Sequence, residues 1–164
     1  MHRVVRRPAR QTRRLRPRNA APGASTAAAA HRTVRFRMAS RRSAVAPTVE
    51  RVLVAVKDAG LSEDQVHDLA VAVAEALSNA AVHGNALRPE SSVRVVVEVT
   101  PRRRAVVDVK DSGQGFDFAE LSDPTDPSRI LMPGGRGVFL MRRLVDQLEF
   151  SDHGSRVRLV MERR

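Results

Sequence analysis

One stretch decides how this chain is interpreted: Ala74-Glu75-Ala76-Leu77-Ser78-Asn79-Ala80-Ala81-Val82-His83-Gly84-Asn85. Its polar residues Glu75, Asn79 and His83 are spaced at i, i+4 and i+8, so they share one face of a helix. Their neighbours are alanine, leucine and valine, and the polar strip therefore borders an apolar stripe. From these residues alone, the strip is either an ordinary solvated helix face or the wall of a binding site.

The helix that carries this strip has a clear predicted start. Ser62 and Gln65 are three residues apart and form the pattern of a capping box, in which each side chain bonds the other residue's backbone amide. The helix is expected to run to about His83, where Gly84-Asn85 breaks it. Its apolar stripe consists of Val66, Leu69, Val73, Ala76, Leu77 and Ala80.

The segments before this helix predict one strand and one shorter helix. Arg32–Met38 alternates apolar and basic residues, as a half-buried strand does. Pro47 fits the first turn of a helix, because its missing N–H would have no partner there. Apolar residues continue at helical spacing to Val56. Gly60 ends this helix, since glycine adopts a left-handed conformation without strain.

The segments after the long helix predict four strands and one helix. Ser92–Thr100 and Arg104–Lys110 alternate and are joined by a turn too short for a parallel crossover, so they form an antiparallel hairpin. Val138–Val145 is helical, and Gln147–Ser151 and Arg156–Met161 are strands around an Asp152–Gly154 turn. The element order β-α-α-β-β-α-β-β predicts an α+β fold, a two-layer α/β sandwich whose mostly antiparallel sheet has helices on one face.

The composition excludes several classes of protein. A chain of 164 residues with 42% hydrophobic residues suits one domain with a real core, and its 3% aromatic share predicts that this core is aliphatic. The lack of cysteine excludes disulfides and thiolate zinc sites. No run of about 18 apolar residues is present, so no membrane helix is expected.

The net charge of +11 is concentrated at one end of the chain. Residues 1–43 hold thirteen of the 29 basic residues and no acidic one, so 16 basic and 18 acidic residues remain in 44–164. We interpret residues 1–31 as a basic, disordered extension and 32–164 as the folded domain. The alternatives for the extension are a phosphate-binding arm for nucleic acid or membrane, and a targeting peptide.

The polar helix face suits phosphate chemistry. The carboxamide oxygen of Asn79 is a hard, neutral ligand of the kind that Mg²⁺ accepts beside phosphates and water. Glu75, one turn earlier, can act as general base for a hydroxyl that attacks a γ-phosphate. His83 is expected to pack or hydrogen-bond at the helix end rather than to bind metal.

Two glycine-containing segments also suit nucleotide binding. In Asp111-Ser112-Gly113-Gln114-Gly115, the carboxylate at a strand end can accept a hydrogen bond from the N6 amine of adenine, and the glycines allow close approach to a planar base. The same residues also suit an ordinary turn. Gly134-Gly135-Arg136-Gly137 lies just before the Val138–Val145 helix, where free backbone amides bind phosphate. It contains no Walker motif and, alone, is equally a simple loop.

Together, the three segments resemble the GHKL superfamily of ATPases and kinases. Glu75-x3-Asn79-Ala80-x2-His83 is similar to its N box, Asp111–Gly115 to its first glycine box, and Gly135–Met141 to its second. The resemblance covers about 32–162. Within the superfamily it is to bacterial anti-sigma factor serine kinases, because the domain is short, Leu69–Gly84 resembles their whole N box, and Leu140–Asp146 resembles the helix after their second glycine box. Gly154-Ser155 departs mildly from the Gly-Thr that they usually have in the last hairpin.

The resemblance implies a fold, a reaction and partners. ATP and Mg²⁺ would bind between the long helix and the sheet, with Asn79 on the metal ion and Glu75 as the catalytic base. Phe116–Gly137 would form a lid, from which Arg129 or Arg136 reaches the phosphates. The implied cofactor-binding set is Asn79, His83, Asp111, Gly113, Gly115, Arg129, Gly134, Gly135, Arg136, Gly137, Val138 and Ser155.

The implied partners are a sigma factor and an anti-anti-sigma (STAS-type) protein whose serine is phosphorylated, in the cytoplasm, with the kinase as a homodimer. Direct nucleic-acid binding and membrane association are not expected. The main alternative is an ATP-binding regulatory module without significant kinase activity. A detached histidine kinase domain would need a histidine-bearing dimerisation helix, which none of the five histidines suits. A nucleic-acid-binding protein acting through its arginine tail is the remaining alternative.

Overall fold

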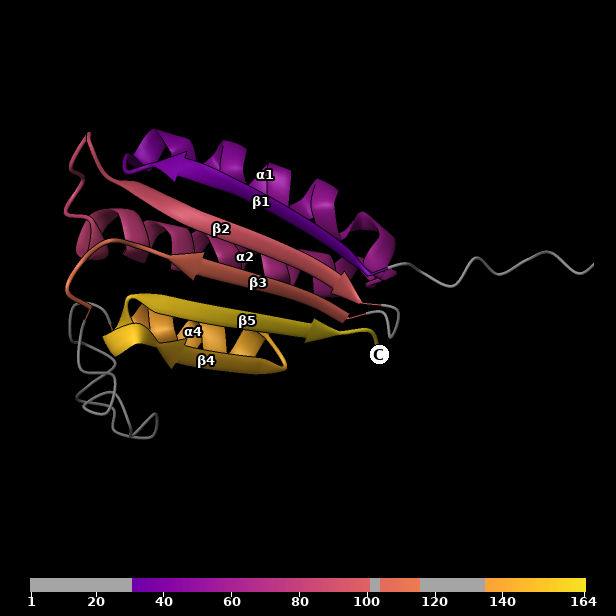
Figure 1. The fold of residues 1–164 in the computed structure, drawn as a ribbon. Coiled ribbons are helices and arrows are strands. Elements are labelled where there is room, and N and C mark those ends of the chain that lie inside the picture. Colours follow the sequence, from indigo (N-terminus) through magenta and orange to yellow (C-terminus); the bar gives the residue numbers. More distant parts are fainter. Residues whose placement is uncertain (1–30, 101–103, 116–134) are drawn as a thin grey trace, which may run out of the picture.

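The computed structural model describes residues 31–100, 104–115 and 135–164. Five strands form one antiparallel sheet in the order β1-β2-β3-β5-β4, and three α-helices cover one face of it (Figure 1). The predicted two-layer α+β architecture is therefore confirmed. The strands are β1 (Arg32–Ala39), β2 (Ser92–Thr100), β3 (Arg104–Lys110), β4 (Gln147–Ser151) and β5 (Arg156–Glu162), and the helices are α1 (Val45–Val56), α2 (Glu63–Asn79) and α4 (Gly135–Leu144).

The predicted hairpin forms the centre of the sheet. β2 and β3 pair antiparallel, with Val97 opposite Val107. The alternate valines of β2 that face the helices (Val93, Val95, Val97 and Val99) are each at most 2% exposed. This strict alternation fixes the register, because a slip of one residue would turn the buried valines to the other face of the sheet.

The predicted capping box at the start of α2 is also confirmed. Ser62 Oγ accepts from the Gln65 backbone N–H at 3.2 Å, and Gln65 Oε1 accepts from the Ser62 N–H at 3.2 Å. The buried Gln65 side chain also donates from Nε2 to the backbone oxygen of Glu162, at 2.6 Å. This bond attaches the beginning of α2 to the end of β5, an interior strand of the sheet.

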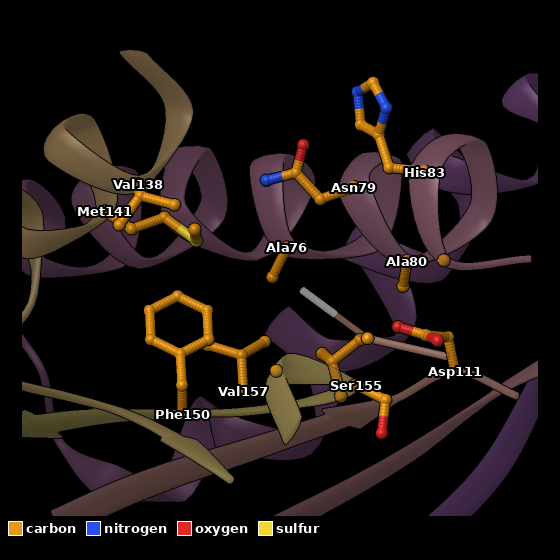
Figure 2. A pocket seen from close by; sticks show the side chains of 14 residues that line it. Ala76, Asn79, Ala80, His83, Asp111, Val138, Met141, Phe150, Ser155 and Val157 are labelled. Atoms are coloured by element: carbon orange, nitrogen blue, oxygen red, sulfur yellow. The ribbon is translucent and has the colours of Figure 1, made fainter. Parts of the chain in front are cut away.

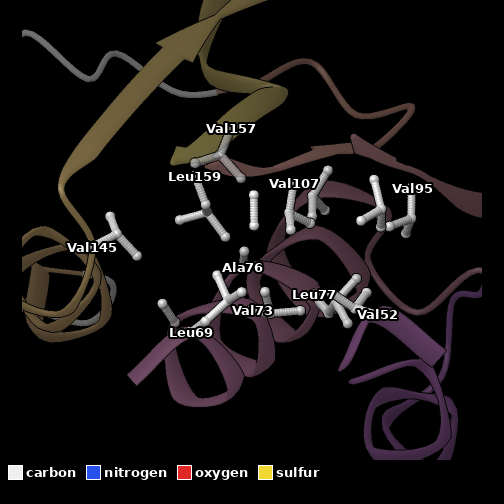
Figure 3. Close-up of a cluster of buried hydrophobic side chains, with 14 of the residues drawn as sticks. Val52, Leu69, Val73, Ala76, Leu77, Val95, Val107, Val145, Val157 and Leu159 are labelled. Atoms are coloured by element: carbon white, nitrogen blue, oxygen red, sulfur yellow. The ribbon is translucent and has the colours of Figure 1, made fainter. Parts of the chain in front are cut away.

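The core lies between α2 and the sheet and is aliphatic, as predicted. Figure 3 shows Leu69, Val73 and Leu77 of α2 facing Leu159 on β5 and Val107 on β3. Each of these five side chains is fully buried. Truncating a buried leucine of this kind to alanine costs about 2–5 kcal/mol of stability, so this layer holds the site residues of α2 in place.

The end of α2 differs from a regular helix. Ala80–Gly84 forms a π-helical turn in which the Asn85 N–H donates to the Ala80 oxygen at 2.8 Å. Ala86 and Leu87 follow with positive φ angles of 51° and 54°. Left-handed conformations of non-glycine residues cost about 1–2 kcal/mol each. The predicted break at Gly84-Asn85 is confirmed, whereas the π-helical turn was not predicted.

The start of α4 corrects one prediction. The glycine segment was expected just before the helix, but Gly135, Arg136 and Gly137 form its first turn. The apolar period begins only at Val138, so it could not reveal the earlier start. Glycine is unfavourable chiefly in the middle of a helix, because it loses the most backbone freedom there, so glycines at the start cost less.

Other predictions fall on undescribed residues. Arg129, Gly134, the lid up to residue 134, and the extension over 1–30 lie outside the described residues. Within the described parts of the chain, no helix is long and apolar enough to span a membrane.

Candidate functional site

A cavity of about 370 Å³ lies between α2, α4 and the end of the sheet (Figure 2). Six of the residues predicted to bind a cofactor line it, from four separate segments of the chain: Asn79, His83, Asp111, Gly115, Val138 and Ser155. The fold therefore gathers residues that are up to 76 positions apart around one hollow. The remaining lining residues are Ala76, Ala80, Gly84, Val109, Met141, Phe150, Gly154 and Val157.

The helix α2 forms one wall of the cavity. In Figure 2, Ala76 and Ala80 point toward the sheet, whereas Asn79 and His83 project from the side of the helix. Small side chains on the inner face leave room for a ligand, while the polar groups stand at the rim. Of the strip predicted from the i, i+4, i+8 spacing, Asn79 and His83 therefore border the cavity. His83 is exposed.

Asp111 stands at one end of the cavity, directly after β3. Its N–H donates to the Ser155 backbone oxygen at 3.0 Å, and its Oδ1 accepts from the Gly113 N–H at 2.8 Å. Figure 2 shows the carboxylate beside the cavity, close to Ser155 and Ala80. Burial raises the pKa of Asp111 above its ordinary value, against the lowering effects of the Gly113 and Asp111 backbone N–H groups on the carboxylate and of the charge of Lys110. A partly desolvated carboxylate of this kind is suited to accept a hydrogen bond from a ligand's amine.

The first glycine loop packs tightly on its neighbours. A Cβ built on Gly113 would overlap the backbone oxygen of Gly84, and one on Gly115 would overlap the backbone oxygen of His153. Gly115 also has a positive φ of 76°. These glycines are therefore required by the protein's own backbone. That they also let a planar base approach stays a prediction.

Glu75 and Asn79 meet the first turn of α4. A Cβ on Gly137 would lie 2.7 Å from Glu75 Oε2 and 3.5 Å from Asn79 Nδ2. Glu75, Gly113, Arg136 and Gly137 are not among the residues that line the cavity itself. The predicted catalytic carboxylate, the amide and the glycine turn are nevertheless adjacent, at the start of a helix, where backbone N–H groups favour anions.

The apolar wall of the cavity was not predicted as part of a site. Met141 of α4, Phe150 of β4 and Val157 of β5 line it and face one another in Figure 2. Alternation along β4 indicates that Phe150 points inward, but nothing in the sequence distinguishes a core position from a cavity wall. Asn85, which follows the π-helical turn, is a further residue that the sequence analysis treated only as a helix break.

The described residues offer few ligands for a metal ion held by protein alone. Among the described residues, no three His, Cys, Asp or Glu side chains gather where they could hold a metal ion. Asn79 offers one neutral oxygen, and its amide nitrogen Nδ2 is the atom that would lie 3.5 Å from a Cβ on Gly137. Mg²⁺ is usually bound by few protein groups together with phosphates and water, so the assignment of Asn79 to Mg²⁺ stays a prediction.

Comparison with known proteins identifies the family of this chain. Residues 38–161 match the family described as histidine kinase-like ATPase domains. A serine-protein kinase RsbW of Bacillus subtilis is 33% identical over 100 residues, covering 57% of this chain and 62% of that protein. A serine-protein kinase RsbW of Bacillus velezensis is 34% identical over 96 residues, covering 55% and 59%. An anti-sigma F factor of Clostridium beijerinckii is 28% identical over 135 residues, covering 80% and 92%.

The similarity to the two serine kinases is partial. The matched stretches span 62% and 59% of the length of those proteins, whereas the match to the anti-sigma F factor spans 92% of its length. The GHKL resemblance inferred from the three boxes is confirmed by the family match, which contains the described residues of all three boxes.

Proposed function

The chain belongs to the family of histidine kinase-like ATPase domains, and on that premise we propose that it is an anti-sigma factor serine kinase. It binds ATP with Mg²⁺, holds a sigma factor, and phosphorylates a serine of an anti-anti-sigma protein. One observation carries the proposal: a single cavity has a partly desolvated carboxylate, Asp111, at one end and the Glu75, Asn79 and Gly137 group close by. The names of the relatives, serine-protein kinase and anti-sigma F factor, support the same reaction and partner.

The base of ATP fits the Asp111 end. The carboxylate oxygen that is not bonded to Gly113 accepts from the N6 amine, which is a charge-assisted hydrogen bond. Met141, Phe150 and Val157 provide the apolar wall for the flat ring. Guanine has an oxygen in place of this amine, so an acceptor at this position favours adenine over guanine.

The phosphates fit the Asn79 end. The first turn of α4 lies beside Asn79 and has backbone N–H groups without helical partners, and the helix dipole favours negative charge there. Asn79 would hold Mg²⁺, which neutralises the phosphate charge as it develops during transfer. Arg136, exposed in the same turn, is one candidate for a further phosphate contact, and Arg129 is the other.

Glu75 is proposed as the catalytic base. It takes the proton of a serine hydroxyl, whose oxygen forms a bond to the γ-phosphorus as the bond from that phosphorus to the β-bridging oxygen breaks. The products are phosphoserine and ADP, with the proton on Glu75. General base catalysis of this kind contributes about 10²–10⁴-fold to a rate.

The partners follow from the same proposal. The substrate is a STAS-type anti-anti-sigma protein, and the sequestered partner is a sigma factor. Both belong to bacterial transcription control, so the proposed compartment is the cytoplasm. A homodimer is proposed from the resemblance to anti-sigma kinases.

One observation favours a second candidate function. Glu75 does not line the cavity, although the Asp111 and Asn79 positions do. A regulatory module that binds ATP without transferring phosphate would show this arrangement. The two functions differ only in whether Glu75 acts on a serine.

The experiment uses ATP labelled at the γ-phosphate, Mg²⁺ and a candidate anti-anti-sigma protein. The wild-type chain and the Glu50→Ala control, which removes an exposed carboxylate of α1, should both label a serine of the partner. Glu75→Ala should bind ATP in calorimetry but transfer at least about 10²-fold more slowly. Binding without transfer by the wild-type chain, with several candidate partners, would favour the regulatory module, and absence of ATP binding would overturn both functions.

A further inference from the structure

We propose that Asn85 is a positioning residue for the nucleotide base, which holds the Asp111–Gly115 loop against the end of α2. The inference rests on the proposed function in one respect, that the cavity binds ATP. Asn85 itself does not line the cavity, and it acts through the loop that does.

The side chain of Asn85 is a buried connector between three segments. Its Oδ1 accepts from the Ser112 backbone N–H at 2.8 Å, and its Nδ2 donates to Ser40 Oγ at 2.6 Å. Asn85 is 2% exposed and Ser40 is 3% exposed. One amide therefore joins the end of α2, the glycine loop after β3 and the segment after β1. Buried amides that are satisfied in this way restrict the backbone that they bond.

The residues on either side of this bond interlock. A Cβ on Gly84 would overlap the Asp111 carboxylate, and a Cβ on Gly113 would overlap the Gly84 backbone oxygen. The Asn85–Ser112 bond lies between these two close approaches along the chain. The glycine loop is therefore packed on the helix end at three consecutive residues, of which Asp111 is the one proposed to bind the base.

The backbone after α2 places Asn85 for this role. The π-helical turn ends with the Asn85 N–H bonded to the Ala80 oxygen, and the Leu87 N–H then donates to the Ala81 oxygen at 2.9 Å. Ala86 and Leu87 are both left-handed, which reverses the chain immediately after Asn85. Strained backbone of this kind persists where the surroundings over-determine it. Here the two side-chain bonds of Asn85 constrain the backbone together with the Leu87 and Arg88 backbone bonds.

The consequence is specific to base recognition. Without Asn85, the Ser112 amide loses its acceptor and the loop is free to shift, so Asp111 no longer stands at a fixed distance from a bound purine. Asn85→Ala should weaken ATP binding by about tenfold or more and reduce the preference for ATP over GTP. A merely destabilising change would leave that preference intact in the molecules that remain folded.

The first test needs no nucleotide. Hydrogen exchange by NMR would follow the Ser112 amide in the ATP-free protein. Asn85→Ala should accelerate its exchange by at least about tenfold, whereas Asn85→Asp should retain protection, because a carboxylate accepts from both Ser112 N–H and the Ser40 hydroxyl. Gln65→Ala removes a buried amide of similar exposure at the other end of α2 and is the matched control.

The second test measures ATP and GTP binding by calorimetry for the same variants. Loss of ATP preference in Asn85→Ala but not in Gln65→Ala would support the proposal. Equal preference in both, or unchanged Ser112 exchange in Asn85→Ala, would overturn it. If the wild-type chain bound no ATP, the proposed function would fail, while the exchange rate of Ser112 would still decide whether Asn85 holds the loop.

Discussion

Gly137 lies against Glu75: a Cβ on this first-turn residue of α4 would come within 2.7 Å of the Glu75 carboxylate oxygen Oε2. Gly137→Ala should therefore push Glu75 aside. Because the displaced atom is at the end of a flexible side chain, and alanine is the better helix former, we expect stability to stay equal or to rise by up to about 1 kcal/mol. Phosphotransfer should fall about 10- to 100-fold, since small displacements of a catalytic group have large effects on rate.

Thermal unfolding and single-turnover phosphotransfer would measure the two effects on one variant. Arg142→Ala, an exposed change on the same helix, is the control and should alter neither strongly. Unchanged phosphotransfer in a stable Gly137→Ala protein would show that the position of Glu75 does not matter for the reaction.

Asp111→Asn should make the ATP-free protein more stable at neutral pH and a poorer ATP binder. Burial raises the Asp111 pKa, so its charged form is disfavoured in the fold. The Gly113 bond to Oδ1 can be kept, but an NH₂ group would replace the second oxygen and face the N6 amine of the base. Loss of a charged hydrogen bond predicts ATP binding about 10- to 100-fold weaker, measurable by calorimetry.

The pH dependence of the same variant has a defined sign. A carboxyl whose pKa is higher when folded binds more protons in the folded state, so its contribution to stability falls as pH rises from 3.8 through the raised value. Thermal midpoints of wild type minus those of Asp111→Asn should therefore decrease over this interval and stay constant above it. An increase with pH would contradict the desolvation of Asp111.

The sequence predicted the parts of this fold that depend on local chemistry. The β2–β3 hairpin was found at its predicted residues because the valines alternate without interruption. The Ser62–Gln65 capping box could be predicted because both of its bonds are made within four residues. Asp111 and Asn79 are placed at one nucleotide site by resemblance, and both line one cavity.

The remaining features depend on contacts between distant residues. Asn85 bonds Ser40 across 45 positions and Ser112 across 27, and no local sequence pattern predicts hydrogen bonds over such distances. Phe150 looks like any inward residue of an edge strand until α4 is seen to leave a hollow beside it. The start of α4 at Gly135 could not be predicted, because glycines carry no apolar signal. It is seen only where the first turn of α4 packs against α2.

Asp108→Asn should lower stability without affecting the nucleotide. Asp108 is buried on the sheet face without helices, where Arg156 Nη2 lies 2.8 Å from Oδ1 and Arg158 Nη1 lies 3.1 Å from Oδ2. Because both arginines keep access to water, we expect a loss of only about 1–2 kcal/mol in chemical denaturation. ATP affinity should stay unchanged. A clear drop in affinity would mean that the ion pairs on this sheet face influence the nucleotide site.

Gly113→Ala and Gly60→Ala should distinguish two reasons why a position requires glycine. Gly60 needs its left-handed φ of 66°, far from the site, whereas Gly113 is required because its Cβ would overlap the Gly84 backbone oxygen. Both changes should reduce stability, by about 1–2 kcal/mol at Gly60 and about 1–3 kcal/mol at Gly113. Only Gly113→Ala should also weaken ATP binding, by about tenfold, because it shifts the Asp111 loop. Calorimetry on both variants at a temperature where each is folded would check this, and equal ATP affinities would show that the loop adapts without moving Asp111.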